Sequence, residues 1–464
     1  MRFDPLVRSF SMIVLFAAGA AGGDSYPIVD TGQATSYDDV APITDPQPGE
    51  AFFGQDSQYV GNQPSHRDNG DGTVSDLNTG LMWQQTPLDD KLEWQEALAA
   101  ADSFELAGYS DWRLPSVKEL YSLIDFRGGS GASVETSVPY LDTDFFDFEY
   151  GDTAAGERLI DAQYWTSTEY VGTTMRGDAT TFGVNFADGR IKGYPQQPPV
   201  GEFTAFVRYV RGNPDYGIND FVDNGDGTVT DQATGLMWMQ ADGGQALNWE
   251  EALAYAANLD AAGHEDWRLP DAKELQSIVD YTAAPDALDP ANEDAAIDPV
   301  FEISNIGTEE EPDFPYFWTS TTHLEGNSSD FAVYLTFGEA WGYMASPANP
   351  NSFERLNVHG AGAQRSDPKD GDPADWPTGN GPQGDEVRIF NHARAVRTVP
   401  EPSPELMLGA AVALLFVLSQ RTPSTPSLAR LAAGAPAPPQ TVETCRSWAS
   451  VRDLSGNMSD VEEF

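Results

Sequence analysis

The feature that most constrains this chain is an internal duplication. Four short motifs occur twice, and each second copy lies 155 residues after the first. Their first copies are D-N-G-D-G-T-V at 68–74, T-G-L-M-W at 79–83, D-W-R-L-P at 111–115 and K-E-L at 118–120. Two later pairs keep the same order, W-T-S-T at 165–168 and 318–321, and V-R-Y-V-R at 207–211 against A-R-A-V-R at 393–397. Since chance does not hold four motifs in one register, the chain contains two copies of one structural unit.

The motifs also set the domain boundaries that we assign. Repeat 1 covers residues 58–212 and repeat 2 covers residues 213–398, with a linker before them at 21–57. The closing motif of repeat 2 is displaced further than the other motifs, which indicates an insertion. We place it at about 345–385, where Gly, Pro and Asn are frequent, and we expect it to be a long loop.

Local patterns predict an α+β unit. Apolar residues recur at helical spacing over 94–101 and 249–256, and S-x-x-E at 116–119 is a capping box that begins a second helix. The later part of each repeat reads as short strands, so we expect two helices and a small antiparallel sheet per repeat. We expect six tryptophans to lie in the two cores, namely Trp83, Trp112, Trp165, Trp238, Trp267 and Trp318.

The arginine of each D-W-R-L-P motif raises a separate question. Arg113 follows Asp111 by two residues, and Arg268 follows Asp266 in the same way. Because a buried charge needs a partner, an internal Asp–Arg bridge is favoured over contact of these arginines with a ligand.

The six ordered motifs resemble the family built on the C-terminal domain of the Legionella collagen-like adhesin. That pattern is a D-G-T-V-x-D…T-G-L-M-W opening, a central D-W-R-L-P…K-E-L, a W-T-S-T segment and a closing V-R-x-V-R, and both repeats carry it. The resemblance implies two tandem C-type-lectin-like domains. It also implies adhesion or carbohydrate binding at the cell surface, without enzymatic activity.

Composition excludes several classes of function. The 25 Lys and Arg residues against 73 Asp and Glu residues give a net charge of −48, which repels nucleic acids and anionic membranes. Cys445 is the single cysteine, so neither an internal disulfide nor a Cys-based metal site can form. The five histidines are scattered, which argues against a zinc hydrolase. An enzyme on the related formylglycine-generating fold would need a cysteine in the repeats, and it is the least supported alternative.

The N-terminus reads as a secretory signal at residues 1–20. Arg2 and Arg8 supply the positive charge, and the apolar run at 12–18 precedes A-G-A at 18–20. We expect signal peptidase to cleave near Ala20, which would place the mature protein outside the cytoplasm.

Residues 399–421 resemble the PEP-CTERM sorting signal of exported Gram-negative proteins. The match rests on Pro400, Glu401 and Pro402, followed by an apolar run at 406–418 and Arg421. It implies recognition by an exosortase and a place at the cell surface, in the outer membrane or in the extracellular matrix. Such signals normally end the protein, whereas here a tail at 422–464 follows, which we expect to be disordered. The tail is either a genuine extension or the product of a shifted reading frame.

Aspartates in the opening motif are candidate calcium ligands, because calcium prefers oxygen donors on a tight Gly-rich loop. A plain hairpin turn is favoured, because an EF-hand alignment puts Arg67 and Val222 at the first ligand position. The candidates are Asp68, Asp71, Asp76, Asp223, Asp226 and Asp231.

Together these observations favour an exported, surface-associated, non-enzymatic binding or adhesion protein. Extracellular polysaccharide is the expected partner, nucleic acid is excluded, and no cofactor is required. The alternative is a structural matrix protein whose repeats pack with their neighbours. Two linked sites would increase avidity, although the charge disfavours sulfated or uronic polymers unless a divalent ion bridges them.

Overall fold

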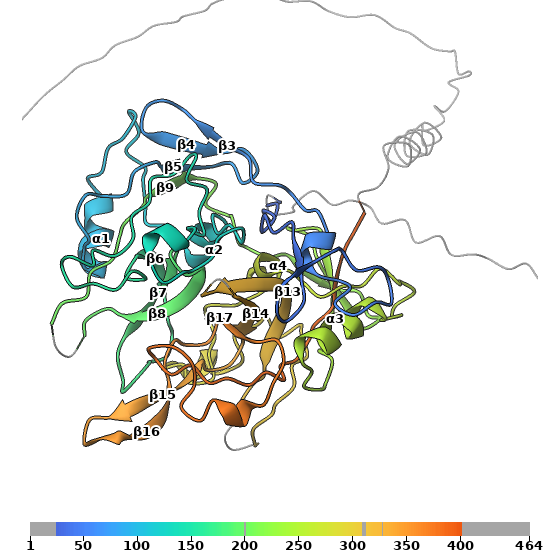
Figure 1. Ribbon diagram of the computed structural model, residues 1–464. Coiled ribbons are helices and arrows are strands. Elements are labelled where there is room, and N and C mark those ends of the chain that lie inside the picture. The colour runs from blue at the N-terminus through green and yellow to red at the C-terminus, as the bar shows by residue number, and fades with distance from the viewer. Residues whose placement is uncertain (1–24, 199–200, 309–311, 327, 401–464) are drawn as a thin grey trace, which may run out of the picture. The chain divides into compact units, whose positions relative to one another are not determined.

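A computed structural model describes residues 25–198, 201–308, 312–326 and 328–400 (Figure 1). The predicted signal peptide with Ala20, the sorting residues Glu401 and Pro402, and the tail at 422–464 lie outside the described residues, whereas Pro400 is exposed at their end. Within the described ranges, no helix is both long and apolar enough to span a membrane.

The expectation of an α+β, C-type-lectin-like fold with one small sheet per repeat is wrong. The structure is mostly β, with 32% strand against 11% helix, and its strands form five sheets. The helices lie where the periodicity placed them but are short: α1 (Trp94–Ala101), α2 (Val117–Tyr121), α3 (Trp249–Ala257) and α4 (Ala272–Ser277). Local periodicity locates helices, but it does not show how strands that are distant in sequence pair with one another.

Each repeat begins and ends in one four-stranded antiparallel sheet. In repeat 1 its order is β3 (His66–Asp68), β4 (Thr73–Asp76), β5 (Leu81–Gln84) and β9 (Val210–Gly212). In repeat 2 the same order is β10 (Phe221–Asp223), β11 (Thr228–Asp231), β12 (Leu236–Met239) and β18 (Val396–Thr398). The opening and closing motifs are therefore neighbours in space, which explains why they recur together.

A six-stranded sheet joins the two repeats. Its order is β13 (Tyr316–Glu325), β14 (Ser328–Thr336), β17 (Gln364–Pro368), β8 (Arg190–Pro195), β7 (Thr180–Asn185) and β6 (Gln163–Glu169), and these strands run across the middle of Figure 1. Repeat 1 supplies one half and repeat 2 the other, and they meet where Ile191 of β8 lies opposite Gln364 of β17. The two repeats therefore share one sheet and cannot be separated without breaking it.

The predicted loop at 345–385 is largely structured. It contains β16 (Asn349–Asn357), which forms a hairpin with β15 (Trp341–Ser346), seen at the lower left of Figure 1. It also contains β17, which is a central strand of the shared sheet. Short 3-10 turns complete the fold: η1 (Asp56–Gln58), η2 (Val134–Thr136), η3 (Pro290–Asn292) and η4 (Pro373–Asp375).

The motif tryptophans form the cores, as predicted. All six are at most 4% exposed. The indole of Trp165 donates to the Leu92 carbonyl at 2.9 Å, and the indole of Trp318 donates to the Leu247 carbonyl at the same distance. For Trp165 and Trp318, burial with a satisfied N–H is the arrangement expected of structural tryptophans rather than of sugar-stacking ones. The indoles of Trp83 and Trp238 are equally buried but have no hydrogen-bond partner among the described residues.

The lysines of the two K-E-L motifs contact the opposite repeat. Lys118 Nζ donates to the Ser277 carbonyl at 2.7 Å, and Lys273 Nζ donates to the Ser122 carbonyl at 2.9 Å. The two contacts are reciprocal, because donors and acceptors are each 155 residues apart. Burial lowers the pKa of both lysines to about 8. The motif therefore holds α2 and α4 together across an approximate two-fold relation.

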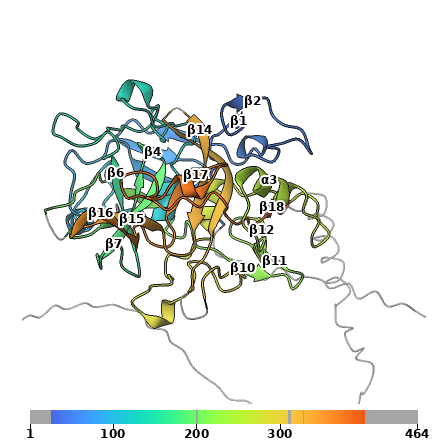
Figure 2. The ribbon, with the colours of Figure 1, turned by 60° about the horizontal axis from the view of Figure 1, so that its bottom comes forward.

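The segment that we assigned as a linker packs on repeat 2. It carries β1 (Ser36–Tyr37) and β2 (Pro42–Ile43), and Figures 1 and 2 show it in dark blue beside α3. The carboxylate of Asp56 accepts hydrogen bonds from Thr321 Oγ1 at 2.6 Å and from Thr31 Oγ1 at 2.8 Å. Burial, together with the charges of Asp30 and Glu274, raises the pKa of Asp56 to about 7 in spite of these bonds.

This carboxylate predicts a measurable pH dependence. The folded protein binds a proton at Asp56 more tightly than the unfolded chain, so stability falls as pH rises from about 4 to about 7. Asp56→Asn removes the titrating carboxyl group. We therefore expect the Tm of the variant minus the Tm of wild type to be a few °C more positive at pH 8 than at pH 5. Differential scanning calorimetry at both pH values measures the effect. The exposed control Asp90→Asn should show no such difference; an equal change in both variants contradicts the assignment.

Candidate binding site between the repeats

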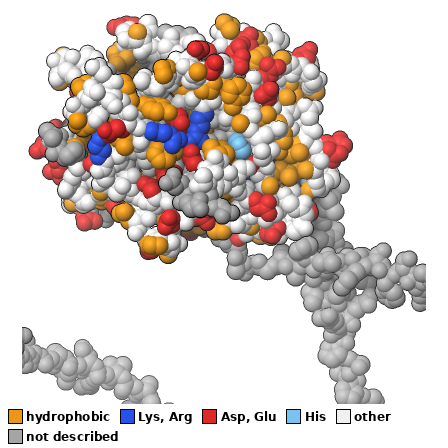
Figure 3. Space-filling view, turned by 90° about the horizontal axis from the view of Figure 1, so that it is seen from below, with side chains coloured by type: hydrophobic (Ala, Val, Ile, Leu, Met, Phe, Trp, Pro, Cys, Tyr) orange, Lys and Arg blue, Asp and Glu red, His pale blue; other side chains and the backbone are white. Residues whose placement is uncertain are grey.

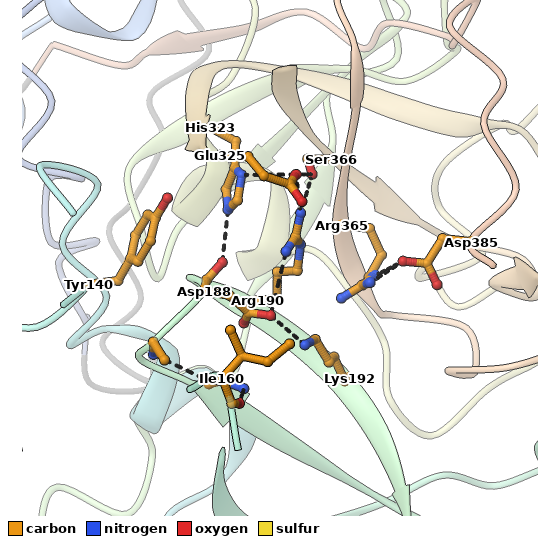
Figure 4. A network of polar contacts seen from close by, with 12 residues as sticks. Tyr140, Ile160, Asp188, Arg190, Lys192, His323, Glu325, Arg365, Ser366 and Asp385 are labelled. Carbon is orange, nitrogen blue, oxygen red and sulfur yellow. Dashed lines mark hydrogen bonds and ion pairs between the residues drawn. The ribbon is translucent and has the colours of Figure 1, made fainter. Parts of the chain in front are cut away.

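A pocket of about 310 Å³ lies where the two halves of the shared sheet meet. Its walls come from β8, β17, the end of β13, and the insertion near Asp385 (Figure 4). Its polar lining consists largely of charged side chains, which form ion pairs and hydrogen bonds with one another. The lining residues with ionisable side chains are Asp188, Arg190, Lys192, Glu325, Arg365 and Asp385.

Repeat 1 supplies the first part of this network. Arg190 donates to Glu325 Oε2 at 2.6 Å and to Ser366 Oγ at 2.7 Å, both in repeat 2. Lys192 Nζ lies 2.5 Å from Asp188 Oδ2. Burial alone would raise the pKa of Asp188, but the charges of Lys192 and Arg190 outweigh it and lower the pKa to about 2. Asp188 is therefore ionised throughout the physiological range.

The insertion of repeat 2 supplies the second part. Arg365 on β17 donates to Asp385 Oδ2 through Nε at 2.8 Å and through Nη2 as well. His359 Nε2 lies 3.1 Å from the other carboxylate oxygen of Asp385. Burial, followed by the charge of Arg365, lowers the pKa of His359 to about 4, so this ring is neutral at pH 7.

A second neutral histidine lies behind the network. His323 stacks on Tyr140, with ring centroids 5.4 Å apart, and its Nε2 lies 2.8 Å from the Asp188 carbonyl. Burial, followed by the charge of Arg190, lowers the pKa of His323 to about 4. The ring is fully buried, so it supports the pocket wall and does not act as an exposed acid or base.

The chemistry of the pocket follows from its charges. Three cations face three carboxylates and both histidines are neutral, so the network has no net charge at pH 7. Arg190 Nε, Arg365 Nη1 and Asp188 Oδ1 have no hydrogen-bond partner among the described residues. A lining with balanced charges suits a ligand with several hydroxyl groups better than a single strong anion.

The candidate calcium ligands lie elsewhere and are occupied by their own turns. Asp68 accepts the amide of Gly70 at 2.8 Å, and Asp71 accepts the Thr73 hydroxyl at 2.6 Å. The amide of Asn78 is bonded to Asp76 at 2.9 Å. The aspartates of repeat 2 make the same kind of local bonds, namely Asp223, Asp226 and Asp231. Among the described residues, no three His, Cys, Asp or Glu side chains are grouped to hold a metal. Calcium binding stays a prediction.

The partners of the motif arginines differ from those predicted. Arg113 pairs with Glu119 of the K-E-L motif at 2.5 Å, and Arg268 pairs with Glu274 at the same distance. The expected bridges to the neighbouring aspartates are wrong, because Asp111 and Asp266 instead bind the last arginine of each closing motif, Arg211 and Arg397. Spacing along the chain did not identify these partners, because the Glu of the following helix and the Arg of the closing motif reach them only through the fold.

Sequence analysis missed every residue of the junction pocket. One pattern in the sequence could have indicated part of this pocket. Arg190 and Lys192 alternate with an apolar residue, so their side chains lie on the same face of a strand. Arg365 and Asp385 lie in the insertion, where the repeat pattern gives no guide to position. Their approach to repeat 1 depends entirely on the pairing of β17 with β8.

Comparison with protein families provides the identification. The model of the Lcl C-terminal domain matches residues 72–211 and 227–353, one region in each repeat. The chain belongs to the Lcl C-terminal domain family. The two matched regions confirm the tandem arrangement, and membership of this adhesin-like family of Gram-negative bacteria indicates a surface-associated protein. It is not a family of enzymes. Neither a curated protein nor a solved structure matches the chain significantly.

The family match ends before β17. Asp188, Arg190, Lys192 and Glu325 lie within the matched regions, whereas Arg365 and Asp385 lie beyond residue 353. The junction pocket thus combines Lcl C-terminal domain residues with residues from the insertion of this chain.

Proposed function

We propose that this protein is an exported, surface-associated adhesion protein that binds a neutral, hydroxyl-rich extracellular polysaccharide in the pocket between its repeats. The observation that carries the proposal is the charge-balanced network of buried Arg, Lys, Asp and Glu side chains in that pocket. Paired charged groups of this kind bind hydroxyl groups through charge-assisted hydrogen bonds while adding no net charge. The volume lies at the lower end of ligand pockets, about 300–1,000 Å³, and suits a short sugar segment.

The charge of the whole chain supports a neutral ligand. Acidic side chains are spread over the face shown in Figure 3, and the few basic side chains gather near its middle. A net charge of −48 repels uronic and sulfated polymers at a distance. A neutral polymer is not repelled in this way. The distribution of charge therefore favours binding of a neutral polysaccharide over binding of an anionic one.

Export is part of the same proposal. The signal peptide at 1–20 would be removed near Ala20, and Pro400, Glu401 and Pro402 would be recognised by an exosortase. The intact mass of the cell-associated protein tests both steps, since each cleavage removes a defined segment.

A pocket-blocking variant tests the binding site. Ala132 lines the pocket and is exposed, so Ala132→Trp fills it without breaking an ion pair. We expect this variant to lose retention on neutral polysaccharide at least tenfold, measured by glycan array or matrix pulldown with and without calcium. Ala154→Trp, at an exposed position outside the pocket, should bind like wild type. Equal retention of both variants, or preferential retention of anionic polymers, contradicts the proposal.

A further inference from the structure

The N-terminal segment covers the W-T-S-T strand of repeat 2. Asp56 accepts the hydroxyl proton of Thr321, as described above. Gln33 pairs with the next residue, since the Thr322 amide donates to Gln33 Oε1 at 2.9 Å and Gln33 Nε2 donates to the Thr322 carbonyl at 2.9 Å. Ser320, Thr321 and Thr322 are consequently buried. Two side chains of the N-terminal segment, Gln33 from a loop and Asp56 from η1, therefore cover this part of β13.

The equivalent strand of repeat 1 has no such cover. β6 and β13 are the two edge strands of the six-stranded sheet. Ser167 and Glu169 of β6 are exposed, although their counterparts Ser320 and Thr322 are buried. The chain has only the short stretch 213–220 before β10, and no second segment of the kind that precedes repeat 1.

The local geometry of the two edges is the same. Thr168 Oγ1 accepts the amide of Val117 at 3.0 Å, and Thr321 Oγ1 accepts the amide of Ala272 at 3.0 Å. Each threonine then has one proton left to donate. In repeat 2 that proton goes to Asp56, whereas no acceptor for the Thr168 proton is found among the described residues.

A groove lies beside this free hydroxyl. Its volume is about 620 Å³, and Trp112, Arg113, Ser116, Glu119, Ser167 and Thr168 contribute to its walls. Ser116 takes the place that Asp271 holds in repeat 2. An incoming carboxylate therefore has one acidic side chain fewer beside it than Asp56 has in repeat 2.

We propose that the groove of repeat 1 docks an acidic segment of another polypeptide, whose carboxylate accepts a hydrogen bond from Thr168 Oγ1. The occupant is defined by what this chain already places on repeat 2: a segment that brings an Asp or Glu carboxylate to the threonine hydroxyl and a Gln side chain to the backbone of the next residue. This site is distinct from the junction pocket and does not depend on saccharide binding.

The N-terminal segment that covers repeat 2 can itself be used as the probe. A synthetic peptide of residues 29–60 is added in trans to the full-length protein, whose own segment already occupies repeat 2. We expect 1:1 binding by calorimetry. Asp56→Leu in the peptide should weaken binding at least tenfold, and Thr168→Val in the protein should weaken it similarly. Thr168→Ser, which keeps the hydroxyl, should restore it, and the exposed control Thr153→Val should have no effect.

Three results would overturn the proposal. The first is no binding of the peptide to the wild-type protein. The second is cross-linking of the peptide to β13 rather than β6, which would mean exchange with the chain's own segment. The third is Thr168-dependent self-association of the protein without peptide, which would assign the groove to a second copy of this chain.

Discussion

Arg208→Met is expected to destabilise the folded protein by about 3–5 kcal/mol. Arg208 is fully buried and has no carboxylate partner in the described structure. Its guanidinium donates to the carbonyls of Gln84 at 2.6 Å, Gln85, and Asp147 at 2.6 Å. Methionine fills part of the volume but removes all three hydrogen bonds, of which the one to Gln84 is fully buried, and a buried group left without its donor costs about 1–3 kcal/mol.

Repeat 2 contains an equivalent buried arginine, which allows a second test of the same prediction. Arg394 is also fully buried and donates to the carbonyls of Met239 at 2.8 Å, Gln240, and Glu302 at 2.7 Å. Each guanidinium also lies over an aromatic ring, Phe146 for Arg208 and Phe301 for Arg394. Burial lowers the pKa of Arg394 to about 10, and it lowers the pKa of Arg208 too. We expect Arg394→Met to cost a similar amount.

The last arginine of the closing motif serves as the control for Arg208. Arg211 ends the same V-R-x-V-R pattern, but it pairs with Asp111, whose side chain is 62% exposed. Arg211→Met should therefore cost less than about 1 kcal/mol. Urea unfolding followed by tryptophan fluorescence measures all three variants. Similar losses for Arg208 and Arg211 would contradict a special role for the first arginine of the motif.

Lys118→Met and Lys273→Met are each expected to cost about 2–3 kcal/mol. Lys118 Nζ also donates to Gly217 O at 3.1 Å and to Asn219 Oδ1 at 3.0 Å, and Lys273 Nζ donates to Asp30 O at 3.0 Å. Loss of these charge-assisted bonds outweighs the relief of burying an ammonium group. Because the two contacts are reciprocal, we expect the two losses to agree within about 1 kcal/mol.

The same unfolding measurement tests this interface. Arg176→Met is the control, because its ion pair with Glu354 is 40% and 44% exposed and should contribute less than about 1 kcal/mol. Both lysine variants should lower the urea midpoint of a single transition, since the shared sheet links the repeats. A large loss for one lysine and none for the other would show that the contact is not reciprocal.

The prediction of the core illustrates what local pattern can do. Trp165 and Trp318 were placed in the two cores because they recur in a conserved order of motifs within this one chain, and both are fully buried. The capping box at Ser116 and Glu119 begins α2 as expected. These features depend on residues within a few positions of one another, so their physics is visible in the sequence.

The pairing of distant segments was not visible in the same way. Arg113 was matched to the nearest acid along the chain, but its partner is Glu119, one turn into the following helix. β17 was read as part of a loop, because its residues show no apolar alternation and its neighbours are rich in Gly and Pro. Its place in the sheet is determined by β14 on one side and β8 on the other.

The sequence by itself determined the duplication, the positions of its short helices, the buried tryptophans and the acidic surface. The tertiary structure decided that the repeats share one sheet, that the K-E-L lysines clamp them together and that a charged pocket forms at their junction. The physical reason is the range of the interactions. Helix caps and apolar periodicity act over a few residues, whereas strand pairing and buried hydrogen bonds join distant segments, as between Arg190 and Ser366, which the chain separates by 176 positions.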